Sequence, residues 1–242
     1  MGYTSVRQED PRLAARIRAA LGDARSVVNV GAGAGSYEPA DLEVTAVEPS
    51  AVMRAQRPPG APPVVDARAE SLPFADASFD AAMAVLSDHH WEDHARGLAE
   101  LRRVARRRVV VFTWEPRTLA DSWLVRDYLP GFARQVPAGY SLDEMLATLG
   151  GGRIESVPIP HDCRDGFLHA YWRRPRAYLD PAVRAGISVC QLLEPDEVAQ
   201  AIARLEADLD SGEWERRNRA LLDLDELDLG YRIVVTELTT CI

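Results

Sequence analysis

Short apolar runs alternate with amphipathic segments along the first half of the chain. Five largely apolar runs have the length of strands, at residues 26–30, 43–48, 64–65, 79–86 and 109–114. Two segments show apolar residues at helical spacing, at 11–22 and through Leu98, Leu101 and Val104. A further helix, with Met53 and Gln56, is expected to stop at Pro58, Pro59 and Gly60. Buried strands that alternate with helices form a parallel sheet covered by helices. The pattern therefore predicts an α/β fold with a doubly wound, mostly parallel sheet and helices on both faces.

The pattern changes after Trp114. The elements expected beyond it are helices near 141–149, 195–210 and 213–223, and strands at 153–159 and 231–237. Between the last two strands, residues 161–228 are richer in Trp, Tyr, Arg and acidic side chains. We therefore predict a sheet domain of residues 1–160 and 229–242, with a helical cap inserted at residues 161–228.

Composition narrows the classes of function. The 242 residues carry 28 basic and 37 acidic side chains, and the net charge of −9 gives no global attraction to nucleic acid. Every basic residue is Arg, which excludes a lysine Schiff base and a phosphate-binding lysine. The arginines at 102–103 and 106–108 are expected to form a solvated helix end, with an anion contact as the alternative. No run approaches the roughly 20 apolar residues of a membrane helix, and Met1 is followed by no apolar signal region, so the cytoplasm is expected.

Cysteine and histidine spacing indicates no metal site. Cys163, Cys190 and Cys241 are an odd number at wide spacing, which fits neither a disulfide framework nor a zinc motif. His161 and His169 flank Cys163, but close neighbours in sequence cannot all point to one centre. We therefore expect no metal.

A glycine-rich segment follows the first predicted strand. Gly31, Gly33 and Gly35 alternate with alanine and are expected to open a helix. Glycines there let the backbone approach a ligand closely, and a tight turn without a ligand is the alternative. Glu48 ends the second predicted strand, and ligands of open parallel sheets bind beyond the carboxyl ends of the strands. A carboxylate there can accept hydrogen bonds from both hydroxyls of a ribose, which favours an adenosine-containing cofactor, while the glycine spacing argues against a dinucleotide.

Five segments occur together in a specific order and spacing. Residues 27–35 read Val-Val-Asn-Val-Gly-Ala-Gly-Ala-Gly, and residues 44–50 read Val-Thr-Ala-Val-Glu-Pro-Ser. Residues 69–74 and 78–80 read Ala-Glu-Ser-Leu-Pro-Phe and Ser-Phe-Asp, and residues 100–104 read Glu-Leu-Arg-Arg-Val. This set resembles the motifs of class I S-adenosylmethionine-dependent methyltransferases, in the small-molecule, type 11 branch. The resemblance implies a Rossmann-like cofactor-binding domain, a substrate-binding cap, S-adenosylmethionine as cofactor and S-adenosylhomocysteine as product.

The resemblance also implies a set of cofactor contacts. They are Asn29, Gly31, Ala32, Gly33, Gly35, Tyr37, Glu48, Pro49, Ser50, Met53, Ala69, Glu70, Leu86 and Ser87. The glycines are expected under the methionine part of the cofactor, with Glu48 on the ribose hydroxyls and Pro49 and Ser50 beside the adenine. Two positions depart from the family pattern: many members have an acidic residue where Asn29 stands, and an Asp where Arg68 stands.

For two side chains near these motifs, the sequence leaves two interpretations open. Glu38 is either an acidic group near the amino end of the cofactor or a solvent-exposed side chain. Met53 packs either on the adenine face or in the core.

The end of the fourth predicted strand faces the reacting methyl group in this family. His89 and His90 there are candidate catalytic bases, because histidine titrates near neutral pH. The alternative is a loop histidine that caps the next helix or packs on Trp91. The candidate substrate contacts are Trp91, Glu115, His161, Tyr171, Trp172 and Arg173. For the residues in the cap, ordinary burial and ion pairing is the alternative.

The predicted function is methyl transfer from S-adenosylmethionine to an O, N or C atom of a small-molecule metabolite. In-line placement supplies much of the catalysis of such a transfer, so an obvious base is not required. Two alternatives stay open: cyclisation or aminocarboxypropyl transfer with the same cofactor, and a cofactor-binding protein without catalysis. The expected partner is a small-molecule acceptor, with no nucleic acid and no membrane, and the chain is expected to be a monomer or homodimer.

Overall fold

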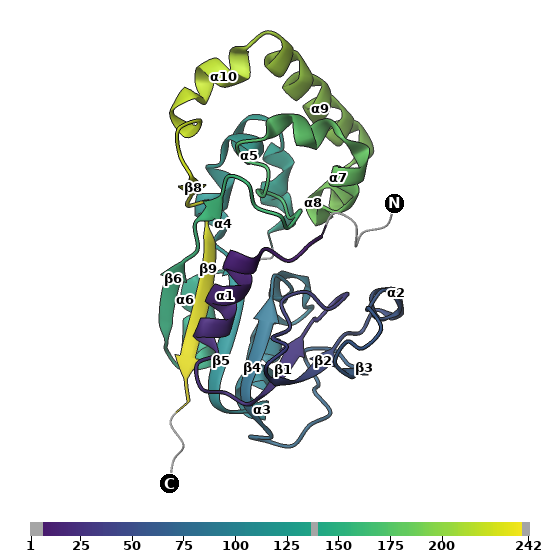
Figure 1. Ribbon diagram of the computed structural model, residues 1–242, viewed down its shortest axis with the longest axis vertical. Coiled ribbons are helices and arrows are strands. Elements are labelled where there is room, and N and C mark those ends of the chain that lie inside the picture. The colour runs from purple at the N-terminus through teal and green to yellow at the C-terminus, as the bar shows by residue number, and fades with distance from the viewer. Residues whose placement is uncertain (1–6, 137–139, 239–242) are drawn as a thin grey trace. The chain divides into compact units, whose positions relative to one another are not determined.

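The chain divides into two compact units. The structure is a computed structural model that describes residues 7–136 and 140–238 (Figure 1). Unit 2 contains the large sheet and comprises residues 11–115, 138–157 and 232–242. Unit 1 is mostly helical and comprises residues 1–10, 116–137 and 158–231. Unit 1 thus includes residues 116–137 as well as the segment expected as a cap, and the assignment of cofactor and substrate to separate domains stays a prediction.

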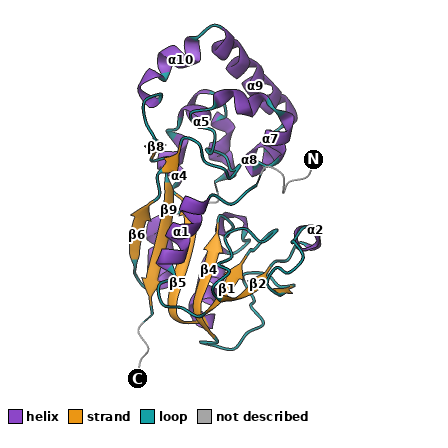
Figure 2. Ribbon diagram, in the orientation of Figure 1, coloured by secondary structure: helices purple, strands orange, loops and turns teal. Residues whose placement is uncertain are grey.

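A seven-stranded sheet organises unit 2 (Figure 2). Its strands are β1 (Ser26–Val30), β2 (Glu43–Val47), β3 (Val64–Val65), β4 (Phe79–Val85), β5 (Ala105–Trp114), β6 (Arg153–Ser156) and β9 (Tyr231–Glu237). Their order is β3-β2-β1-β4-β5-β9-β6, and the first five are parallel. β9 runs antiparallel to β5. The evidence is that the backbone N–H of Leu238, just after the end of β9, donates to the Arg107 carbonyl near the start of β5. The predicted mostly parallel, doubly wound sheet is confirmed.

Helices cover both faces of this sheet. The helices of unit 2 are α1 (Pro11–Ala20), α2 (Ala51–Ala55), the short 3-10 helix η2 (Asp88–His90), α3 (His94–Val104) and α6 (Leu142–Leu149). In Figure 1, α1 lies in front of the sheet and α3 and α6 lie behind it. Asp93 caps α3 by accepting a hydrogen bond from the Arg96 backbone, and Ser141 caps α6 in the same way from Glu144. Gly150 ends α6 in the left-handed conformation, with φ of 83°.

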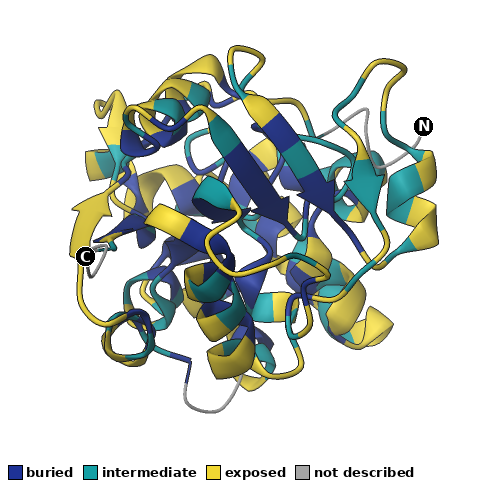
Figure 3. Ribbon diagram, turned by 90° about the horizontal axis from the view of Figure 1, so that it is seen from below, coloured by how far each residue is buried: buried dark blue, intermediate teal, exposed yellow. Residues whose placement is uncertain are grey.

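Alternate strand residues build the core behind the sheet. Val28 and Val30 of β1 pack in one buried cluster with Leu98, Leu101 and Val104 of α3. The i, i+3, i+6 spacing of the three α3 residues places them on one face of the helix, which explains why the sequence pattern located it. Figure 3 shows these strands buried while the helices keep exposed outer faces.

Unit 1 packs short helices around aromatic side chains. Its elements are α4 (Pro116–Ala120), α5 (Trp123–Asp127), η3 (Pro130–Gln135), β7 (Ile159–Pro160), η4 (Pro175–Leu179), α7 (Pro181–Ala185), α8 (Ser188–Leu192), α9 (Pro195–Asp210), α10 (Glu213–Arg217), η5 (Arg219–Leu221) and β8 (Glu226–Leu227). The rings of Trp123 and Trp214 lie 5.2 Å apart, edge to face. Trp123 donates its indole N–H to the Trp172 carbonyl at 3.0 Å, and Trp172 donates its own to the Ile159 carbonyl at 2.9 Å.

The helix expected after the glycine-rich segment does not form. Residues 31–42, all of which the structure describes, are turns and irregular backbone. Gly31, Gly33 and Gly35 have φ of 72°, 54° and 98°, and Tyr37 has φ of 61°. Four left-handed residues within seven positions cannot belong to a right-handed helix. The prediction of a helix here is wrong, and β1 connects to parallel β2 through turns.

We predict that Leu101→Ala lowers the free energy of unfolding by about 2–5 kcal/mol, because it leaves a cavity in a fully buried cluster. Val52→Ala on α2 is the control: its side chain is 69% exposed, so the change should stay within about 0.5 kcal/mol. Urea unfolding of both variants measures the difference. Equal stability of the two variants would contradict the assigned core.

Candidate functional site

The strand order reverses between β1 and β4, and the ends of these strands approach closely. Ser87 follows β4 and donates its hydroxyl to the Val30 carbonyl at 2.9 Å. A Cβ added to Gly31 would lie 2.6 Å from Cβ and Oγ of Ser87, so only glycine fits after β1. Leu86 has φ of 50°, a conformation that bulky side chains rarely adopt. This edge is the topological switch point, where open α/β sheets bind ligands.

Glu48 holds the glycine turn against the end of β2. One carboxylate oxygen accepts the backbone N–H of Gly33 at 2.8 Å, and the other accepts that of Ser50 at 2.8 Å. The Ser50 hydroxyl in turn caps α2 by accepting the Met53 backbone N–H at 3.3 Å. Glu48 is only 7% exposed. Each oxygen of a carboxylate has two lone pairs, so both can accept a further hydrogen bond.

A buried ion pair lies beside the same turn. Glu38 accepts a hydrogen bond from Arg57 Nη2 at 2.8 Å and from the Asn29 side-chain amide at 3.2 Å. The side chains of Glu38 and Arg57 are 4% and 5% exposed, so the solvent-exposed interpretation of Glu38 is wrong. Arg57 Nη2 also donates to the Pro62 carbonyl. Within the described residues, Asn29 Oδ1 and Arg57 Nε and Nη1 are buried and have no hydrogen-bond partner.

The predicted adenine side is formed by α2 and the segment after β3. The methyl carbon of Met53 lies 3.4 Å from the position that a Cβ on Gly33 would take. Ala69 is buried, and the Glu70 carboxylate accepts the backbone N–H groups of Glu92 and Asp93 at 2.8 and 3.2 Å. Burial would raise the pKa of Glu70, but these backbone donors lower it below its ordinary value. Glu70 thus fastens the loop before α3.

Arg68 lies at the exposed side of this arrangement, with its Nε 3.6 Å from the Glu70 carboxylate. Its side chain is 54% exposed and pairs with Glu92 at 2.6 Å. The residue that departs from the family pattern is therefore directed to a surface ion pair rather than held in the core.

A buried carboxylate lies beneath the histidine loop after β4. Oδ2 of Asp88 accepts hydrogen bonds from His94 Nε2 at 3.2 Å, Thr113 Oγ1 at 3.1 Å and the Tyr140 hydroxyl at 2.8 Å. The hydroxyl oxygens of Thr113 and Tyr140 also lie beside each other, but each hydroxyl has a single proton and in this arrangement both protons are used on Asp88. Burial would raise the pKa of Asp88, but the hydrogen bonds from His94 and Tyr140 and the charge of His94 outweigh it and lower the pKa. Burial and the Asp88 charge raise the pKa of the Tyr140 hydroxyl.

The two candidate bases follow Asp88 in the short 3-10 helix η2, with their rings tilted at 47° to each other. The rings of His89 and His90 lie 4.0 Å apart, and Trp114 Nε1 donates to His89 Nδ1 at 3.3 Å. An indole can only donate, so Nδ1 of His89 is an acceptor and a neutral His89 carries its proton on Nε2. Trp91 packs against Gly97 of α3, and its ring centroid lies 6.0 Å from that of His94.

The predicted substrate contacts divide between the two units. Trp91 and Glu115 belong to unit 2, where Glu115 pairs with Arg232 at 3.1 Å. In unit 1, His161 Nδ1 bonds the Asp225 carbonyl at 3.1 Å, and Arg173 donates to the Leu224 carbonyl at 2.6 Å.

The two aromatic candidates of the cap differ in exposure. Tyr171 is half-buried, with the Arg174 guanidinium 4.8 Å from its ring centroid. Trp172 is fully buried and uses its indole N–H in the core. Its burial leaves Trp172 no accessible face for an acceptor in this structure, whereas Tyr171 keeps one.

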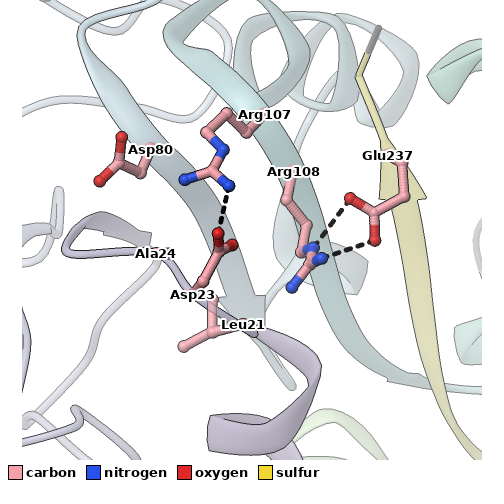
Figure 4. A pocket seen from close by; sticks show the side chains of 7 residues that line it. All are labelled: Leu21, Asp23, Ala24, Asp80, Arg107, Arg108 and Glu237. Carbon is pink, nitrogen blue, oxygen red and sulfur yellow. Dashed lines mark hydrogen bonds and ion pairs between the residues drawn. The ribbon is translucent and has the colours of Figure 1, made fainter.

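A small pocket lies at the opposite edge of the sheet, at the amino ends of β1, β4 and β5 (Figure 4). Arg107 and Arg108 line it and pair with Asp23 and Glu237. These arginines lie in β5, so the expectation that residues 106–108 end a helix is wrong. The lining has three carboxylates, of Asp23, Asp80 and Glu237, against two guanidinium groups, and each of these five groups is already in an ion pair, so none is left to select an ion.

Two negative findings concern only residues 7–136 and 140–238. No group of three or more His, Cys, Asp or Glu there could hold a metal ion. No helix in those ranges is long and apolar enough to cross a membrane. Cys241 lies outside the described residues.

The sequence analysis did not identify several side chains at the carboxyl edge of the sheet. Arg57 carries no local signal, because a helix-end arginine before two prolines is ordinary. Asp88 precedes α3 and His94 begins it, six residues later. This short separation could have indicated that the two side chains are hydrogen-bonded. Thr113 and Tyr140 come from distant segments, and their approach to Asp88 depends on the tertiary fold.

We predict that Asp88→Asn lowers the free energy of unfolding at pH 7 by about 2–3 kcal/mol, because three donors lose a charged acceptor. The lowered pKa of Asp88 means that its contribution is complete above its ordinary value of 3.8 and is lost as pH falls below it. The difference between wild type and variant should therefore shrink below about pH 4. Urea unfolding at pH 7, 4 and 3 measures it, and a difference that persists unchanged at pH 3 would contradict an ionised Asp88.

Comparisons with known proteins bear on this site. A family model described as a methyltransferase domain matches residues 28–113. A solved structure from Anabaena variabilis, assigned as a methyltransferase of an antibiotic biosynthesis pathway, is 33% identical, covers 96% of this chain and 99% of its own, and has a TM-score of 0.89. The cyclase SpnF shares the fold, with 17% identity, a TM-score of 0.54 and coverage of 93% and 79%. The uncharacterized protein YafE of Escherichia coli is 40% identical over 60 residues, which are 23% of this chain and 29% of YafE.

Proposed function

Because the chain belongs to the family of S-adenosylmethionine-dependent methyltransferases, we propose that it transfers the methyl group of this cofactor to an O, N or C atom of a small molecule. The observation that carries the proposal is the buried Glu48 carboxylate between the glycine turn and α2. It stands at the switch point of the sheet, where a ligand meets the ends of β1, β2 and β4.

The residues at this edge fit the cofactor. Glu48 retains a lone pair on each oxygen, which suits the two hydroxyls of a ribose. Gly31 lets Ser87 lie directly against the backbone after β1, and Gly33 places its backbone beside the methyl carbon of Met53. The further contacts that we propose are Ala32, Gly35, Tyr37, Pro49, Ser50, Ala69, Glu70 and Leu86. The cofactor supplies an electrophilic methyl carbon on its sulfonium, and the chain supplies its orientation.

The acceptor is proposed to lie at the histidine loop after β4. His89, held by Trp114, orients an acceptor through its Nε2 proton, and the more exposed His90 accepts a proton from a hydroxyl or amine. Trp91 and Glu115, in the same unit, are further proposed contacts. His161, Tyr171 and Arg173 belong to unit 1 and stay predicted substrate contacts.

Charge supports a small-molecule acceptor. The net charge of −9 offers no global attraction to nucleic acid. We propose a metabolite acceptor and a cytoplasmic monomer or homodimer.

We predict that Glu48→Gln weakens binding of S-adenosylmethionine and S-adenosylhomocysteine about ten- to hundredfold, because hydrogen bonds to a charged acceptor are lost. Titration calorimetry measures the affinity. Glu43→Gln is the matched control, since Glu43 is exposed at the other end of the same strand. Equal affinities for the two variants would remove Glu48 from the site, and no binding by the wild type would overturn the proposed function.

We predict that incubation with isotopically methyl-labelled S-adenosylmethionine and a metabolite extract labels a small molecule and releases S-adenosylhomocysteine. SpnF shows that this fold also occurs in a cyclase, so the fold alone does not select methyl transfer. Mass spectrometry of the products decides: methylthioadenosine would indicate aminocarboxypropyl transfer instead. An acceptor converted with no change in the cofactor would indicate cyclisation. Tight cofactor binding without any product would favour a binding protein.

A further inference from the structure

Two consecutive residues of η2 are connected to the last two residues of β5. Oδ2 of Asp88 accepts the Thr113 hydroxyl at 3.1 Å, and Nδ1 of the next residue, His89, accepts the indole N–H of Trp114 at 3.3 Å. Asp88 and Thr113 are fully buried, and Trp114 is 7% exposed. These side chains thus continue the pairing of β4 with β5 beyond the end of β4.

Tyr140 contacts both of these connections. Its hydroxyl donates to Asp88 Oδ2 at 2.8 Å, and its ring centroid lies 5.0 Å from that of Trp114, with the two planes at 40°. Tyr140 is 7% exposed, and burial raises the pKa of its hydroxyl, which therefore keeps the proton that it donates. One side chain from a distant segment thus touches the acceptor of the first connection and the donor of the second.

The connection between Trp114 and His89 decides which nitrogen of His89 carries a proton. A neutral imidazole has one N–H, and the nitrogen that accepts the indole N–H cannot carry it. His89 then has its proton on Nε2 for as long as the indole N–H points at Nδ1. An indole can turn about its side-chain bonds, so this selection needs a neighbour that packs on the indole and holds its direction.

We propose that Tyr140 is a positioning residue for His89. Its ring holds the indole of Trp114, and its hydroxyl fixes that ring to Asp88, the residue next to His89. His89 is then a donor at Nε2, and its remaining lone pair, on Nδ1, is occupied by the indole. On the basis of the proposed function, His89 orients the acceptor and His90 takes the proton that the acceptor loses. Tyr140 therefore separates the roles of two adjacent histidines.

The test is nitrogen NMR of the full chain labelled with ¹⁵N at histidine. It is made at about pH 9, where histidines of ordinary pKa are neutral. Protonated and unprotonated imidazole nitrogens resonate far apart, and the spectrum of His89→Gln identifies the signals of His89. Wild type should show His89 with Nε2 protonated and Nδ1 unprotonated. Tyr140→Leu should shift the ratio of the two tautomers about five- to tenfold toward Nδ1 protonation, as expected when one hydrogen bond is lost.

Two further variants are the controls. Trp114→Phe removes the indole N–H and should shift the ratio in the same direction. Tyr178→Leu is the matched control, because Tyr178 is also buried and its hydroxyl donates to the Leu168 carbonyl at 2.7 Å, in unit 1. It should leave the tautomer of His89 unchanged, whatever it does to stability. An equal shift in Tyr178→Leu would overturn the inference, since the tautomer would then report only general loosening of the fold.

An unchanged ratio in Tyr140→Leu or in Trp114→Phe would also overturn the inference. If circular dichroism shows that Tyr140→Leu is unfolded, Tyr140→Phe replaces it and removes only the hydroxyl on Asp88; a shifted ratio supports the positioning role, and an unchanged ratio overturns it. A wild type in which His89 populates both tautomers overturns this inference alone, because methyl transfer does not depend on one fixed histidine. Failure of the cofactor to bind or to donate its methyl group overturns the proposed function and leaves the tautomer result valid.

Discussion

The carboxylate of Glu48 is the interaction on which the site depends. Its two oxygens hold Gly33 and Ser50, and so join the turn after β1 to the start of α2 at the carboxyl edge of the sheet. The turn has no helix to support it, and left-handed backbone at its glycines would otherwise leave its N–H groups without fixed partners. A buried carboxylate that accepts backbone N–H groups orders the turn and keeps an acceptor at the edge. Under the proposed function, structure and ligand binding therefore use the same side chain.

Buried charge is concentrated at this edge, and its hydrogen bonding is uneven. Glu48 is bonded through both oxygens, whereas Asp88 receives three donors on one oxygen and none on the other within the described residues. Arg57 is bonded through one nitrogen only. Unsatisfied buried groups cost stability, and such costs gather where a protein binds or reacts. The core cluster behind the sheet, by contrast, consists of apolar side chains, among them Val28 of β1 and Leu101 of α3.

Sequence patterns that extend over a few residues predicted the strands and helices of the sheet. The alternation of apolar runs located β1 to β5, and the spacing of Leu98, Leu101 and Val104 located α3, because one periodicity decides each element. The helix predicted after the glycines was wrong. Glycines indicate that the backbone comes close to another group, but they do not determine the conformation of the residues that follow. Glu48 was found because it ends a strand. Arg57 and Tyr140 were not, because their partners are brought to them by chain segments distant in sequence, and periodicity carries no information about such pairs.

The most direct test of the account is a crystal structure with S-adenosylhomocysteine bound. The account predicts the ribose hydroxyls on the Glu48 carboxylate, with the backbone of Gly31 and Gly33 beneath the amino acid chain of the ligand. A ligand at the opposite edge of the sheet, in the pocket lined by Arg107 and Arg108, would contradict it. So would a ligand at the carboxyl edge whose ribose does not meet Glu48.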